Sequence, residues 1–177
     1  MPRAVVYGPI ALGGLSFVHL ETEQFCLQLV YLVRSLSKDT LQTREYHHLI
    51  AAYQQYLGIS TQFFSIDPFA ICYKPINSLI TYLWTEMHKY DVRLVSDLFW
   101  IPKSRFTNDQ SIMEVILTRQ REHVGTSSAL STRMVTNANT VRLHLRCTFA
   151  SDLVDPASNH IIESLYQANT PRTTPQK

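Results

Sequence analysis

Apolar residues recur along most of the chain at spacings of three and four, which is typical of amphipathic helices. The segment from Thr22 to Leu36 is apolar almost all round, which indicates a helix buried on most sides. A second helix is predicted over 41–57, and Asp39 with Gln42 resembles a capping box at its start. Gly58 directly after it fits a C-cap. The buried face of this second helix is expected to contain Tyr46, Leu49, Ile50, Tyr53 and Leu57.

Three further helices are predicted in the second half of the chain. Pro75 fits the first turn of a helix that runs to about Tyr90. Asn108 or Asp109 is expected to cap a short helix ending near Ile116, and 92–102 is expected to be extended. The last long helix is predicted over 129–146. Its apolar stripe is Leu130, Met134, Ala138, Val141 and Leu145.

The two ends of the chain have a different character. Residues 4–18 are rich in β-branched and aromatic types, and the Gly13-Gly14 pair permits a tight reversal of the backbone. Residues 166–177 are polar and contain proline, so they are predicted to be disordered. The fold class is therefore mainly α, an irregular bundle of about four to five helices with a short extended N-terminal segment. The expected organisation is an extended segment with a Gly-Gly turn over 1–20, a helical domain over 21–165 and the tail.

Composition adds a hint about partners. Of the 177 residues, 45% are hydrophobic and only 17% are charged, whereas ordinary domains have about 25% charged residues. Either some apolar surface is meant for a partner, or the chain has a compact, tyrosine-rich core. The net charge of +2 is too small to argue for nucleic acid or an anionic membrane. No acid occurs from 123 to 151, where Arg133, Arg142 and Arg146 form a candidate site for phosphate; a solvated face is the alternative.

The cysteines and the absence of long apolar runs bear on location. Cys26, Cys72 and Cys147 are odd in number and far apart, which favours reduced thiols inside the cell. No run reaches the roughly 18 apolar residues that a membrane span needs. The chain is predicted to be intracellular, in the nucleus or the cytoplasm, with no membrane contact.

The sequence contains no recognisable set of catalytic residues. The histidines and cysteines lack the spacing of a zinc site, and the five glycines match no phosphate-binding loop. The aspartates are scattered beside turns and helix ends rather than placed to converge on two metal ions. We predict no catalytic residue, no metal and no cofactor in this chain.

Two groups of residues resemble a known family. The first group is Pro9 with Gly13-Gly14-Leu15, followed by a helix; the second contains three spaced motifs in order along the chain. The motifs are Leu57-Gly58-Ile59-Ser60; Arg105, Asp109, Ile112 and Met113; and Asn139, Arg142, Leu143, Leu145, Phe149, Ser151, Asp152 and Leu153. Together they resemble the region after the polymerase core in LINE-like, non-LTR retrotransposon reverse transcriptases of protist-type eukaryotes. Ser16 departs from that pattern, because the family prefers glycine there.

The resemblance implies that the catalytic palm lies upstream, outside this chain, which would then be a truncated or decayed fragment or a separate reading frame. The chain would be a non-catalytic accessory segment, similar to a thumb or connection domain. Its partners would be the upstream reverse-transcriptase domain of a longer polyprotein and RNA or DNA held through Arg133, Arg142 and Arg146. Replacing Arg142 and Arg146 by alanine is expected to weaken that binding without unfolding the chain. The alternatives are a free-standing helical module that binds another protein and, more remotely, a hydrolase with an unrecognised site.

Overall fold

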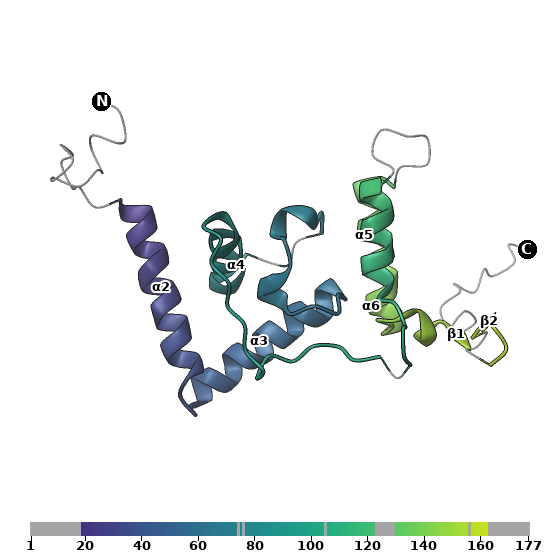
Figure 1. The fold of residues 1–177 in the computed structure, drawn as a ribbon, viewed down its shortest axis with the longest axis horizontal. Coiled ribbons are helices and arrows are strands. Elements are labelled where there is room, and N and C mark those ends of the chain that lie inside the picture. The colour runs from purple at the N-terminus through teal and green to yellow at the C-terminus, as the bar shows by residue number, and fades with distance from the viewer. Residues whose placement is uncertain are drawn as a thin grey trace, which may run out of the picture. The chain divides into compact units, whose positions relative to one another are not determined.

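The computed structural model describes residues 19–73, 75, 77–104, 106–122, 130–155 and 157–162, and most of its regular structure is α-helical (Figure 1). The predicted mainly helical fold class is therefore confirmed. The elements, in chain order, are α2 (Leu20–Leu36), α3 (Leu41–Leu57), η2 (Phe63–Ser65), η3 (Pro68–Ala70), α4 (Leu79–Lys89), α5 (Ile112–Glu122), α6 (Thr132–Leu145), η4 (Ala150–Asp152), β1 (Val154–Asp155) and β2 (His160–Ile161).

The chain divides into two compact units, Met1–Tyr46 and His47–Lys177, and the boundary falls inside α3. The extended segment with Gly13 and Gly14, and the tail expected from 166 onward, lie outside the described residues. The short antiparallel pair of β1 and β2, with Val154 opposite Ile161, was not expected from the sequence.

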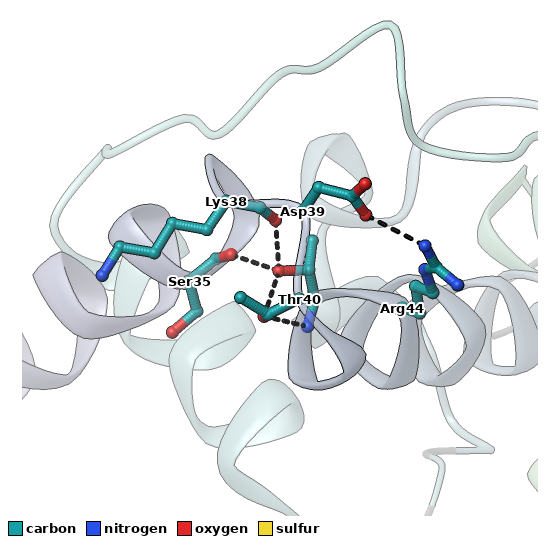
Figure 2. Close-up of polar contacts among 6 residues, drawn as sticks. Ser35, Lys38, Asp39, Thr40 and Arg44 are labelled. Atoms are coloured by element: carbon teal, nitrogen blue, oxygen red, sulfur yellow. Dashed lines mark hydrogen bonds and ion pairs between the residues drawn. The ribbon is translucent and has the colours of Figure 1, made fainter.

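In the first unit, a polar turn joins α2 to α3 (Figure 2). The Thr43 hydroxyl lies 2.7 Å from the Ser35 carbonyl oxygen and also contacts the carbonyl oxygen of Lys38. Thr40 Oγ1 accepts a hydrogen bond of 3.2 Å from the Thr43 amide, so Thr40 caps α3.

The capping box predicted at Asp39 and Gln42 is therefore wrong. Asp39 forms an exposed ion pair with Arg44 at 3.3 Å instead, and Gln42 Nε2 donates to the Tyr31 hydroxyl.

The core of the second unit is built from aromatic rings. Phe63 in η2 lies 4.7 Å from Trp84 of α4 and 5.8 Å from Tyr53 of α3, measured between ring centroids. Trp84 Nε1 donates to the Ile66 carbonyl oxygen at 2.7 Å, so its buried N–H is satisfied. On α3 itself, Ile50 and Leu57 are buried as predicted, whereas Leu49 is exposed.

Helix α4 starts later than the sequence suggested. Ser78 and Thr81 form a reciprocal capping box: the Ser78 side chain accepts from the Thr81 amide, and Thr81 Oγ1 accepts from the Ser78 amide. Pro75 precedes this cap and so does not lie in the first turn, as had been predicted. Leu83 and Met87 are buried on this helix, and Tyr90 follows its last residue.

The last two helices also depart from the predicted bounds. α5 starts after Ser111, whose Oγ accepts from the Glu114 amide at 3.4 Å, so neither Asn108 nor Asp109 is the cap. α6 is capped by Ser131, and its buried positions are Val135, Asn139 and Arg142. The apolar stripe predicted for this helix is wrong, because two of its members, Met134 and Val141, are more than half exposed.

Candidate functional site

Arg142, one of the three candidate phosphate-binding residues, is only 4% exposed. Its Nη2 donates to the carbonyl oxygens of Gln55 and Tyr56, each at 2.8 Å, and its Nη1 donates to the Cys147 carbonyl oxygen at 3.2 Å. Nε and Nη2 both donate to Asn139 Oδ1, at 3.0 and 2.9 Å. The guanidinium therefore joins the last turn of α3 to the end of α6 and cannot reach a phosphate, so the predicted nucleic-acid contact does not fit this geometry.

Gly58 provides the space that the guanidinium occupies. A Cβ atom added at this glycine would lie 2.5 Å from Arg142 Cζ, and the φ angle of +66° already favours glycine. The Gly58 carbonyl oxygen accepts a hydrogen bond from the Ser111 hydroxyl, just before α5. We call Gly58, Ser111, Asn139 and Arg142 the arginine clamp, which connects α3, α5 and α6.

A second polar group supports the clamp. Glu114, in the first turn of α5, accepts hydrogen bonds from the amide and the hydroxyl of Ser60, at 2.8 and 2.7 Å. Tyr73 donates its hydroxyl to the Leu57 carbonyl oxygen at 2.9 Å, and burial raises the pKa of this hydroxyl well above its usual range. Glu114 and Tyr73 therefore bind the backbone on either side of Gly58, at Ser60 and at Leu57.

A carboxylate fixes the segments on either side of α5 and α6. Asp109 accepts hydrogen bonds from the hydroxyls of Ser104 and Ser151 and from the Ser151 amide. Although partial burial acts in the opposite direction, these hydrogen bonds together hold the pKa of Asp109 below its usual value. Asp152 accepts from the amides of Thr148 and Phe149. Asp109, Ser151 and Asp152, which are among the residues that carry the resemblance, thus connect or cap segments of the fold.

Arg133 and Arg146 are exposed, unlike Arg142. Arg133 lies in the first turn of α6, whereas Arg146 follows its last residue with a φ angle of +56°. Thirteen residues of helix separate their backbones by about 20 Å, so the two side chains cannot hold one phosphate together. Arg119 and Arg121 on α5 are also exposed, but residues two apart on a helix point to different sides, so they do not form one cationic surface.

The segment between α4 and α5 presents apolar side chains to solvent. Val95, Leu98 and Trp100 are 64%, 71% and 49% exposed, while Phe99 between them is buried. Phe99 packs against Phe64, with ring centroids 5.7 Å apart. We call Val95, Leu98 and Trp100 the apolar ridge. The sequence predicts that residues 92–102 are extended but does not mark them as a binding surface.

The side chains that could bind a metal ion are scattered over the described part of the chain. No three histidine, cysteine, aspartate or glutamate side chains converge there in a way that could hold a metal ion. A shallow hollow on α5 is lined by Glu114, Arg119 and Glu122 among others, and Glu114 is already engaged by Ser60. The three cysteines are all free, and burial raises the pKa of Cys147.

Comparisons with known proteins add no relative. No protein family, curated protein or solved structure matches the chain. The resemblance to retrotransposon reverse transcriptases therefore stays a prediction from the sequence. Among the helices described, none combines the length and the apolar character needed to cross a membrane.

Proposed function

We propose that the chain is a non-catalytic helical accessory segment that packs against a neighbouring protein domain. The observation that supports this proposal is the exposure of the apolar ridge. Val95, Leu98 and Trp100 lie within six residues of one another, and exposed groups of apolar side chains often mark protein–protein interaction sites. The resemblance indicates which partner: a reverse-transcriptase domain encoded upstream in the same polyprotein.

The ridge has a defined backbone, which favours binding. Gln62 Nε2 donates to the Ser96 carbonyl oxygen at 3.1 Å, and the Ser96 amide donates back to Gln62 Oε1 at 3.4 Å. Together with buried Phe99, this pair holds the segment in place before any partner arrives, so little conformational entropy is lost on binding. Tryptophan is also among the residues that contribute most at protein interfaces.

The test uses the polymerase domain encoded immediately upstream in the genome, purified and titrated with this chain. We expect Leu98→Ser with Val95→Ser to weaken binding at least tenfold, because both remove apolar contact area from the interface. The matched control is Met134→Ser with Val141→Ser, which removes exposed apolar side chains from α6 and should leave the affinity unchanged. Equal losses in both pairs, or no binding by the unmodified chain, would overturn the proposal.

A second candidate function is binding to a nucleic-acid duplex through Arg133 and Arg146. The observation in its favour is that both residues are exposed, and neither forms an ion pair with an acidic side chain among the described residues. Two such contacts would give weak, sequence-independent affinity that falls as salt displaces the protein. Arg142 is no part of this surface, so the double substitution that includes it is not a clean test.

The clean test replaces Arg133 and Arg146 by alanine and measures binding of a labelled RNA–DNA duplex at two salt concentrations. We expect lower affinity and a slope of log K against log salt that is smaller by about 2, since two phosphate contacts are lost. Arg93→Ala with Lys103→Ala removes two other exposed cations and serves as the control. An unmodified chain that does not bind even at low salt would exclude this function.

A further inference from the structure

Helix α2 has an exposed face that follows a heptad pattern. Leu20, Leu27 and Val30 are 79%, 63% and 44% exposed, and Glu23 and Arg34 are exposed as well. These five residues recur at alternating spacings of three and four, as the a and d positions of a coiled coil do. Phe25 and Leu32, on the opposite side of the same helix, are buried. The prediction that this helix is buried on most sides is therefore wrong. We call these five exposed residues the α2 seam.

The charges of the α2 seam are placed symmetrically about its apolar centre. Glu23 precedes Leu27 by four residues, and Arg34 follows Val30 by four. Eleven residues of helix hold the two charged residues about 16 Å apart, so they cannot pair with each other on one helix. Neither side chain has an ion-pair partner among the described residues.

We propose that α2 pairs in antiparallel orientation with α2 of a second copy of this chain. A two-fold axis between residues 28 and 29 places Leu27 against Val30 of the other copy, twice. The same axis places Glu23 against Arg34 of the other copy at both ends, which matches a positions with d positions as antiparallel coiled coils require.

Charge selects this arrangement over its alternative. A parallel pair in register would bring Glu23 against Glu23 and Arg34 against Arg34, and like charges at such positions are unfavourable. Tyr31, which is half exposed, flanks the seam and extends its apolar area. The charges of the α2 seam therefore favour one orientation and one register of the two helices.

The dimer is expected to be weak. A helix of 17 residues is about 26 Å long, and a single pair of such helices buries less area than the roughly 1,200–2,000 Å² of stable interfaces. We expect a dissociation constant on the order of 10 to 100 µM, with rapid exchange. This inference does not depend on the proposed function, because it uses a different surface from the apolar ridge.

Sedimentation equilibrium of the full chain over a range of concentrations tests the proposal. The unmodified chain should show a monomer–dimer equilibrium, and Glu23→Arg or Arg34→Glu alone should weaken it at least tenfold. Mixing these two single variants should restore dimers at wild-type strength, because each then supplies the charge that the other lacks. That recovery also shows that neither variant is misfolded.

Glu21→Arg is the matched control. Glu21 lies in the same first helical turn, so its reversal has a similar effect on the helix dipole, but it lies off the seam. We expect this variant to dimerise normally. A chain that stays monomeric at several hundred micromolar, a Glu21→Arg variant as impaired as Glu23→Arg, or a mixture without recovery would each overturn the proposal. In those cases another part of the chain or another protein covers α2.

Discussion

Arg142 carries a charge into the protein interior, where its hydrogen-bond acceptors are neutral oxygen atoms. Desolvation by this burial lowers its pKa, but an arginine stays protonated in proteins because its pKa starts so high. Two of the acceptors are carbonyl groups in the last turn of α3, where the helix dipole is negative. The charge is thus balanced by oriented backbone dipoles, which makes Arg142 a structural residue.

A double-mutant cycle between Gly58 and Arg142 tests this role. Arg142→Ala should cost about 3 kcal/mol or more in free energy of unfolding, because several buried carbonyl groups lose their donor. Gly58→Ala should cost about 2–4 kcal/mol, through the left-handed backbone and the clash with the guanidinium. In the double variant the clash is absent, so the two costs should fall short of additivity by at least 1 kcal/mol.

Urea unfolding followed by circular dichroism gives the four free energies of this cycle. Ser131→Ala combined with Arg142→Ala serves as the control pair, because Ser131 caps the other end of α6 and makes no contact with the guanidinium. That pair should be additive. If the losses in free energy of unfolding from Gly58→Ala and Arg142→Ala are also additive, the close approach of these two residues is not maintained in solution.

At the scale of elements, the helices themselves were accessible from the sequence because periodicity is a local property. The residues of α2 and α3 repeat at helical spacing over four turns or more, and both helices lie within two residues of their predicted bounds. Their ends were harder to predict. Asp39 and Thr40 are both good caps, and which one acts depends on where the Thr43 hydroxyl finds acceptors in the turn after α2.

Helix α6 shows why a buried face can be misjudged. Its sequence offers an apolar stripe through Met134 and Val141, yet the face that packs inward contains Asn139 and Arg142. Polar residues are normally buried only when they are hydrogen-bonded. The acceptors that allow it here, Gln55 and Tyr56, lie more than 80 positions away in the sequence. A local pattern contains no information about partners at that distance.

At the scale of the whole molecule, the residues that carry the resemblance come together in the second unit. Gly58 meets Arg142, while Asp109 meets Ser151, which follows it by 42 positions. The sequence identified these positions as a recurring pattern but assigned Arg142 to binding. The structure gives these positions a folding role. The exposed surfaces, namely the apolar ridge and the α2 seam, lie outside the motifs that carry the resemblance, and the sequence did not predict them as sites.

Asp109 links the stability of this unit to pH. Its pKa is lower in the folded protein than the value of about 3.9 expected for an unfolded chain. The unfolded state therefore takes up a proton first as the pH falls, and the stabilisation is complete only above that unfolded value. It is lost as the pH drops through the lower, folded pKa. The contacts that disappear connect the segment before α5 to η4.

Thermal unfolding between pH 2.5 and pH 7 should reveal this dependence. Asp109→Asn should lower the stability at pH 7 by about 1–2 kcal/mol, because the amide group of asparagine cannot accept all the donors that a carboxylate accepts. Its melting temperature should also fall less steeply with acid than that of the unmodified protein, because one carboxylate that is ionised in the native state is missing. Asp97→Asn removes an exposed carboxylate with no hydrogen bond among the described residues and should leave the profile unchanged. If both variants follow the unmodified profile, Asp109 does not hold these segments together.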